Sequence, residues 1–279
     1  MNGKELPLHV ETLGLEPTPD ADTVLMIHGY GASAFSWRCW APRLAERAHV
    51  VLVDLKGSGA APKPDDGRYR LEDQAELLHR LVLQRDLRRL TIVGHSLGGG
   101  IALLLALRLH DDEEDRLARL VLVASAAYEQ RLPPFVSLAR YRRIAIALFR
   151  LLGARFVIRK VLRSIVYDPH AVTGNQVEGY AAPLDDAGAR RALIDSALSL
   201  VPERIEALNT RFFELAVPAL ILWGRYDRVV PLWVGERLLE VLPNATIHVF
   251  EQCGHMPAEE IPEESFARLA TFLDETAPT

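Results

Sequence analysis

The chain of 279 residues is long enough for one large domain with an insertion or for two small domains. About half of its residues (49%) are apolar and a quarter (25%) are charged, which is ordinary for a globular protein. The net charge of −5 is mild and no nucleic-acid motif is present, so we expect no nucleic-acid partner.

Redox and targeting features are weak. Cys39 and Cys253 are too few and too far apart to form a disulfide framework. Residues 1–7 lack the apolar core of a signal peptide, and the apolar run 101–107 is too short to span a bilayer. We therefore predict a cytoplasmic protein, and the oligomeric state stays open.

Strands and helices are predicted to alternate along the chain. Nearly continuous apolar runs indicate strands that are covered on both faces; they lie at 24–27, 50–53, 90–93, 120–123, 219–222 and 246–250, and 9–15 is a candidate antiparallel edge. Helical patterns lie at 37–47, 71–84, 97–109, 232–242 and 264–273. This alternation predicts an α/β fold with a mostly parallel sheet and helices on both of its sides.

The stretch from about 128 to 208 breaks the alternation, because it contains helical patterns and no convincing strand. It falls between two predicted core strands. We therefore predict a core in two parts, 1–127 and 211–279, with a helical cap inserted at 128–210 over the carboxyl edge of the sheet.

Segment 94–98 reads Gly-His-Ser-Leu-Gly and lies between the predicted strand 90–93 and the predicted helix 97–109. A Gly-x-Ser-x-Gly at a strand-to-helix turn holds the serine on a strained elbow with an exposed hydroxyl. The glycines are needed because a side chain two positions on either side of the serine would collide across the turn. We therefore predict that Ser96 is a nucleophile rather than a helix N-cap.

A serine nucleophile needs a base to take its proton and a carboxylate to orient that base. Asp227 follows the predicted strand 219–222, and His255 follows the predicted strand 246–250. Both loops open on the sheet edge where Ser96 lies, which is where such sheets bind ligands. The sequence thus predicts a triad of Ser96, Asp227 and His255, with Asp54 as an alternative carboxylate.

The chain order of nucleophile, acid and base, together with the elbow, resembles the α/β-hydrolase family. The resemblance covers almost the whole chain through five ordered motifs, at 28–31, 54–59, 94–98, 224–227 and 254–257. It implies the α/β-hydrolase fold with an inserted helical cap. It also implies an oxyanion hole made by the backbone N–H groups of Tyr30 and Leu97, and a reaction that needs no cofactor or metal.

Apolar residues near the predicted triad would form a pocket for a small, hydrophobic acyl or aryl ester. We assign Gly29, Phe35, His95, Trp223 and Met256 to this pocket. Trp223 is equally well interpreted as a core residue, and His95 as a residue that packs against the elbow.

The nucleophile narrows the reaction. Haloalkane dehalogenases and epoxide hydrolases of the family are similar in length and layout but carry aspartate at the elbow. Serine members with a helical cap include carboxylesterases and the meta-cleavage-product hydrolases, which break a carbon–carbon bond. We predict a serine esterase, with carbon–carbon hydrolysis as the alternative and a non-catalytic binding protein as a third interpretation.

The predicted cap is strongly basic in one part. Residues 131–167 include nine Arg or Lys and no Asp or Glu, and Arg155, Arg159 and Arg163 recur every four residues on one helical face. We expect a solvated arginine face over a core-packed apolar face. The alternative is weak contact of this basic amphipathic segment with an anionic membrane surface.

Overall fold

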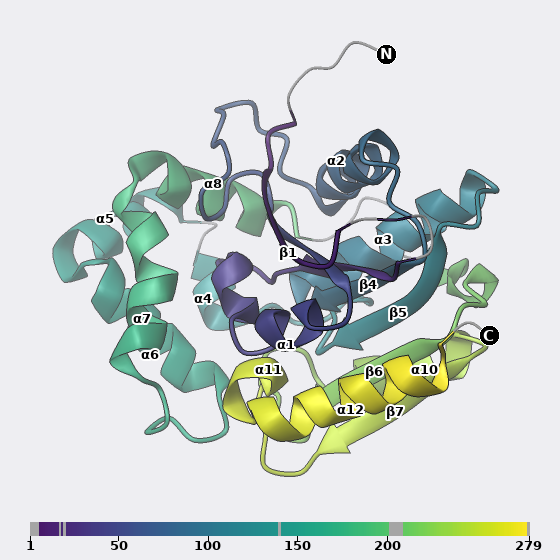
Figure 1. Ribbon diagram of the computed structural model, residues 1–279. Coiled ribbons are helices and arrows are strands. Elements are labelled where there is room, and N and C mark those ends of the chain that lie inside the picture. Colours follow the sequence, from purple (N-terminus) through teal and green to yellow (C-terminus); the bar gives the residue numbers. More distant parts are fainter. Residues whose placement is uncertain (1–5, 17, 19–20, 139–140, 201–208, 278–279) are drawn as a thin grey trace.

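The computed structural model describes residues 6–16, 18, 21–138, 141–200 and 209–277 (Figure 1). Seven strands form one sheet in the order β1-β3-β2-β4-β5-β6-β7, in which β1 is antiparallel to β3 and the other pairs are parallel. The strands are β1 (His9–Gly14), β2 (Thr23–Ile27), β3 (His49–Asp54), β4 (Leu90–His95), β5 (Leu117–Val123), β6 (Ala219–Gly224) and β7 (Ala245–Phe250).

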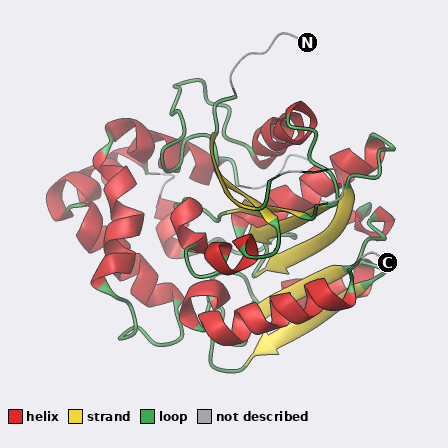
Figure 2. Ribbon diagram, viewed as in Figure 1, coloured by secondary structure: helices red, strands yellow, loops and turns green. Residues whose placement is uncertain are grey.

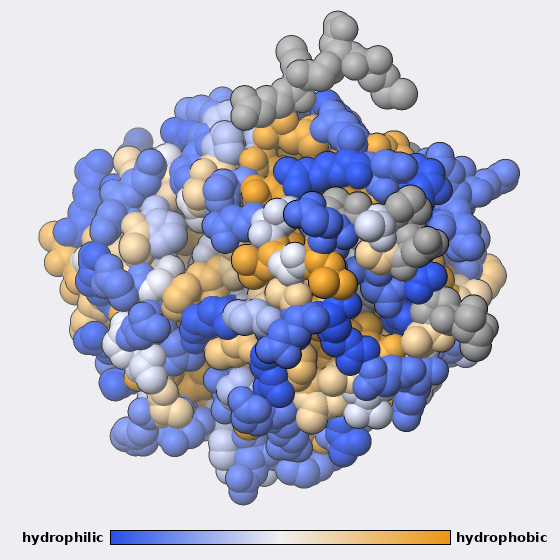
Figure 3. Space-filling model, viewed as in Figure 1, coloured by the Kyte–Doolittle hydropathy of each residue, from blue (hydrophilic) through white to orange (hydrophobic). Residues whose placement is uncertain are grey.

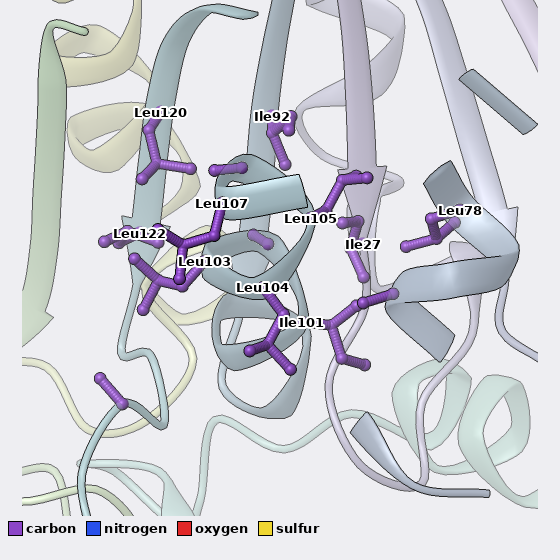
Figure 4. Close-up of a cluster of buried hydrophobic side chains, with 14 of the residues drawn as sticks. Ile27, Leu78, Ile92, Ile101, Leu103, Leu104, Leu105, Leu107, Leu120 and Leu122 are labelled. Atoms are coloured by element: carbon purple, nitrogen blue, oxygen red, sulfur yellow. The ribbon is translucent and has the colours of Figure 1, made fainter. Parts of the chain in front are cut away.

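Helices cover both faces of the sheet because alternate strand residues point to opposite sides. On one face, Ile27, Ile92 and Leu122 pack with α2 (Leu71–Gln84), α3 (Leu97–Asp111) and α10 (Trp233–Val241). Figure 4 shows α3 side chains against this face. On the other face, Met26 and Val93 pack with α1 (Ala41–Ala45) and α12 (Pro262–Glu275).

Between β5 and β6 the described residues form helices and no strand (Figure 2). We use the name cap helices for α4 (Pro134–Ser137), α5 (Arg142–Leu152), α6 (Ala154–Ile165), α7 (Gly174–Ala181), η3 (Ala182–Asp185) and α8 (Ala187–Leu198). They lie together at the left of Figure 1, on the side to which the arrowheads of β6 and β7 point. Their apolar side chains form two small clusters, and Ala32 and Met256 of the core pack into one of them.

Every predicted strand is present, and the predicted helices 71–84, 97–109, 232–242 and 264–273 are confirmed with small changes at their ends. The predicted helix 37–47 is only partly confirmed. It is divided into η1 (Ala34–Trp37) and the short α1, because Pro42 has no N–H with which to continue a helix from the preceding turn.

Two short elements complete the described chain, namely η4 (Phe212–Glu214) before β6 and α11 (Pro257–Glu260) after the loop that carries His255. Within the residues that the structure describes, no helix has the length and apolarity needed to cross a membrane.

Candidate active site

Ser96 lies on a strained turn between β4 and α3. Its φ of 54° falls in the left-handed region that side chains disfavour. A Cβ at Gly94 would lie 2.5 Å from the Gly98 carbonyl oxygen, and one at Gly98 would lie 2.3 Å from the Ile27 carbonyl oxygen. Both glycines are therefore needed, because the backbone segments of the elbow lie too close together to leave room for a Cβ atom at either position.

The three predicted triad residues meet at the carboxyl edge of the sheet. The Nε2 atom of His255 lies 2.9 Å from Ser96 Oγ, and its Nδ1 lies 2.8 Å from Asp227 Oδ2. The side chains of Asp227 and His255 are almost fully buried. This arrangement has the distances that a serine, its base and the carboxylate orienting the base require.

Backbone donors hold the Asp227 carboxylate. Its Oδ1 accepts hydrogen bonds from the backbone N–H groups of Val229 (2.7 Å) and Val230 (2.9 Å), which leaves Oδ2 for His255. The buried Trp223 indole in turn donates to the Val230 carbonyl oxygen at 3.0 Å. The loop after β6 is thus tied to the core, and the direction of the carboxylate is fixed.

Glu260 holds the loop that carries His255, a role that the sequence analysis did not identify. Its Oε2 accepts hydrogen bonds from Gly254 N (3.0 Å) and from Tyr167 N after α6 (2.7 Å). Its Oε1 accepts one from Met256 N (2.8 Å). The backbone N–H of His255 itself donates to the Ile165 carbonyl oxygen at 3.0 Å, so the same loop is bonded directly to the end of α6.

In the sequence, the only feature that could have indicated this role is the position of Glu260, five residues after His255 and two before Pro262. That spacing alone does not distinguish a carboxylate bonded to its own loop from an exposed charge in the first turn of a helix. The three hydrogen bonds that Glu260 accepts from backbone N–H groups of two separate segments distinguish these two cases, and they exist only in the folded chain.

His95 supports His255 from the elbow. Its Nε2 lies 2.8 Å from the His255 carbonyl oxygen, and the two ring centroids are 4.9 Å apart. Loss of contact with water lowers the pKa of His95 to about 3, and a positive charge on His255 lowers it further. His95 is therefore neutral at physiological pH and donates through Nε2 to that carbonyl oxygen.

The predicted oxyanion donors border the same space. Leu97 is the first residue of α3, and Tyr30 follows β2 in the loop that contains Gly29. Among the described residues, the backbone N–H groups of Tyr30 and Leu97 donate to no protein acceptor. The Tyr30 hydroxyl donates to the Leu193 carbonyl oxygen of α8 at 2.9 Å, which connects this loop to the cap helices.

A cavity of about 230 Å³ lies over Ser96 and His255, between the sheet edge and the cap helices. Gly29, His95 and Met256, which the sequence analysis assigned to a substrate pocket, are among the residues that line it. Most of the other lining residues are apolar. Those that come from α5, α6 and the loop after β5 include Leu148, Phe149, Val157, Val161 and Leu132. No Lys or Arg occurs among the described residues that line it.

Two predicted pocket residues lie elsewhere. Phe35 packs edge-on against Tyr180, 5.9 Å between ring centroids, with the Arg38 guanidinium over its face. Trp223 is fully buried, and its indole supports the Asp227 loop from below. Neither lines the cavity, because the folded chain uses each to join two elements instead.

Two other polar candidates have structural partners. Each oxygen of Asp54 accepts a backbone N–H, from Ala34 and from Ala60, both at 2.7 Å. His28 lies 2.8 Å from the Gly29 carbonyl oxygen through Nδ1 and accepts from Leu55 N through Nε2. Asp54 is therefore not paired with His255. The described residues contain no group of three His, Cys, Asp or Glu side chains that could hold a metal ion.

Comparison with protein families agrees with the observed fold. The family model described as "alpha/beta hydrolase fold" matches residues 22–262, which include all three triad residues and the cap helices. A curated relative from Pseudomonas putida, named 2-hydroxy-6-oxononadienedioate/2-hydroxy-6-oxononatrienedioate hydrolase 2, is 32% identical over 282 residues. The match covers 96% of this chain and 92% of the relative.

Solved structures show the same fold. An esterase from Exiguobacterium antarcticum is similar with a TM-score of 0.77 at 22% identity, covering 96% of this chain and 95% of the esterase. A meta-cleavage product hydrolase from Pseudomonas fluorescens is similar with a TM-score of 0.77 at 24% identity, covering 96% of this chain and 94% of that one. Identities this low are evidence for the fold alone.

Proposed function

Because the chain belongs to the alpha/beta hydrolase fold family, we propose that this hydrolase cleaves neutral, apolar carboxylic esters through an acyl-enzyme. In this proposal Ser96 Oγ attacks the ester carbonyl carbon while His255 Nε2 takes the hydroxyl proton. The bond from that carbon to the alcohol oxygen then breaks, and His255 gives the proton to the leaving alcohol. Water, deprotonated by His255, releases the acid and restores Ser96.

The proposed roles follow from the positions of the groups. Asp227, buried and held by two backbone donors, orients His255 and stabilises its positive charge during attack. The backbone N–H groups of Tyr30 and Leu97 would bind the oxyanion that forms. The amino end of α3, which begins at Leu97, adds a favourable dipole at the same place.

The observation that carries the choice of substrate is the absence of cations from the described cavity lining. The Pseudomonas putida relative is named for a dioate, a substrate with two carboxylates. A dianion in this cavity would lose its hydration without a Lys or Arg partner, and it would meet the carboxylate of Glu129, which is one of the lining residues. A neutral ester has neither cost, so the cavity favours esterase chemistry over carbon–carbon hydrolysis.

The test is hydrolysis of p-nitrophenyl esters from acetate to palmitate by the wild type and by Ser96→Ala, with Ser164→Ala at an exposed cap serine as control. We expect the elbow variant to lose a factor on the order of 10⁴ to 10⁶ in kcat, by analogy with other serine triads. The control should match the wild type. Turnover by Ser96→Ala within tenfold of the wild type would overturn the assignment.

The carbon–carbon alternative is tested in parallel with a yellow dicarboxylate ring-fission product, whose bleaching reports cleavage. We expect its kcat/KM to fall below that of the best ester. If instead the dicarboxylate is the better substrate and Ser96 still reacts with a fluorophosphonate, the triad stands and the proposed substrate class is wrong. Failure of Ser96 to react would favour the non-catalytic interpretation.

A further inference from the structure

The outer face of the hairpin formed by α5, Gly153 and α6 exposes large apolar side chains. The sequence predicts that these residues pack in a core, but in the structure four of them are exposed. They are Leu151 (81% exposed), Ile144 (52%), Leu152 (48%) and Phe156 (45%). In Figure 3, apolar surface reaches the left edge of the molecule, where α5 lies in Figure 1. A group of exposed apolar side chains of this kind usually marks a binding surface.

Cations surround these apolar side chains. Arg143 and Arg150 of α5, and Arg159, Lys160 and Arg163 of α6, are all exposed. Within the described part of the chain these five have no ion-pair partner, whereas Arg155 pairs with Glu178 and Asp185. Lys160 Nζ lies 5.7 Å from the Phe156 ring centroid, so charge and apolar surface are in contact. The outer face is therefore both apolar and positive.

We infer that the outer face of the α5–α6 hairpin docks on a lipid bilayer that carries anionic headgroups. Apolar side chains of an amphipathic helix enter the boundary between headgroups and acyl chains, while Lys and Arg bind the headgroups. Leu151, the most exposed of the apolar side chains, lies at the tip of the hairpin beside Gly153, where it would enter first.

Charge argues against two other occupants. A second copy of the chain in a symmetric dimer would place the same surface on both sides, so that five unpaired cations would face five others. A nucleic acid would satisfy the cations but would leave Leu151, Leu152 and Ile144 without an apolar partner. An anionic bilayer satisfies both parts of the surface.

The inner faces of the same two helices line the cavity over Ser96. Ala145, Leu148 and Phe149 of α5 border it, as do Ile158 and Leu162 of α6. Docking through the outer face would thus place the cavity next to the acyl chains, from which an apolar ester could enter. The identity of the delivered substrate rests on the proposed function, whereas the docking itself does not.

The experiment is co-sedimentation of the full-length wild type with vesicles of phosphatidylcholine alone or of phosphatidylcholine with 30% phosphatidylserine. Because each Lys or Arg near such a surface contributes about 1 kcal/mol, five cations should favour the anionic vesicles by at least about tenfold even if only some reach the headgroups. Equal recovery in the supernatant with both kinds of vesicle would overturn the proposal.

Variants separate the two contributions. Arg159→Gln/Arg163→Gln should weaken binding to anionic vesicles about 30-fold, and Leu151→Ser should weaken it about tenfold. The matched controls are Arg85→Gln/Arg268→Gln, at exposed arginines away from the cap helices, and Phe213→Ser, at an apolar side chain that is 62% exposed. The controls should bind like the wild type; if they weaken binding equally, the surface is not specific.

Two further measurements complete the test. Hydrolysis of a soluble short ester should be unchanged in the hairpin variants, because none of the substituted residues lines the cavity. Loss of vesicle binding with normal ester turnover would then concern the docking proposal alone. Normal vesicle binding without ester turnover would concern the proposed function alone. Size-exclusion chromatography that showed a dimer of the wild type and a monomer of Leu151→Ser would overturn the lipid proposal in favour of a second copy.

Discussion

The two sides of the cavity are held in place by different interactions. On the sheet side, polar groups are paired atom by atom: Asp227 has two backbone donors, His255 has two side-chain partners, and Glu260 has three backbone donors. On the cap side, α5 and α6 contribute only apolar side chains to the cavity. Hydrogen bonds have a direction and apolar contacts do not, so only the sheet side can fix the angle of a reacting group.

This difference assigns separate tasks to the two regions. In the proposed function, reaction chemistry depends on the sheet side, where a change of one atom should be costly. Substrate choice would depend on the cap side, through the volume of the cavity and the lack of Lys or Arg among its described lining residues. Changes that remove one directed interaction on the sheet side should therefore have large effects, and changes at the joint between the two regions should have smaller ones.

The largest effect is expected for Asp227→Asn. The amide keeps the size of the carboxylate but removes its charge, and it can turn its NH₂ toward His255, which would hold the imidazole in the wrong tautomer. In serine proteases the equivalent change costs about 10⁴ in kcat, and we expect a similar loss for soluble esters at pH 7. The measurement is steady-state hydrolysis of p-nitrophenyl butyrate.

Asp54→Asn is the matched control for Asp227→Asn, because Asp54 was the alternative carboxylate and is bonded to Ala34 and Ala60 instead. Among molecules that remain folded, it should retain kcat within a few-fold of the wild type. If the two variants lose activity equally, or if Asp54→Asn loses more, the triad has been assigned to the wrong acid.

The sheet side was predictable from sequence because its geometry is imposed by local sterics. Gly94 and Gly98 are required by contacts of 2.5 Å and 2.3 Å that any Cβ would make, and the two loops that follow β6 and β7 must open at the same edge. Local rules of this kind leave a pattern in the sequence. They allowed Ser96, Asp227 and His255 to be located, although their catalytic roles remain predictions.

The cap side was less predictable, because apolar residues on a helix do not reveal which neighbour will cover them. Phe35 and Leu151 are both large and apolar, yet one packs on Tyr180 and the other is in solvent. Their environments depend on how the cap helices pack on the core, which no short-range pattern records. The boundaries of the cap at 128 and 210 likewise stay predictions.

A second, smaller effect concerns pH and the sheet side. Reduced contact with water lowers the pKa of His95 from 6.5 to about 3, so between these values the unfolded chain binds a proton that the folded chain does not. Protonation of His95 in the unfolded chain therefore lowers the free energy of unfolding as the pH falls from 6.5 toward 3, and it has no such effect well above pH 6.5. Between pH 7.5 and pH 5 the free energy of unfolding should fall by up to about 2 kcal/mol through this group.

His95→Gln tests this pH dependence, because glutamine does not titrate but keeps an N–H donor for the His255 carbonyl oxygen. Urea denaturation at pH 7.5 and pH 5 should show a smaller loss of stability for this variant than for the wild type. His170→Gln, at an exposed histidine, is the control and should keep the wild-type dependence. An unchanged dependence in His95→Gln would place the acid sensitivity elsewhere, with the buried His28, whose pKa is also lowered by burial, as the next group to examine.

The smallest effect is expected at the joint between the two regions, for Glu260→Gln. The amide oxygen can still accept hydrogen bonds, but the NH₂ group cannot, so at least one of the backbone donors at Gly254, Met256 and Tyr167 loses its partner. His255 would then be less well aligned, and we expect kcat to fall about tenfold. KM should change little, because Glu260 does not line the cavity.

Glu263→Gln, at a glutamate side chain that is 86% exposed, is the matched control for Glu260→Gln. A rise in KM at constant kcat would mean that Glu260 positions the cap helices rather than His255. Glu260 would then belong with the residues that select the substrate, and not with those that orient the reacting groups.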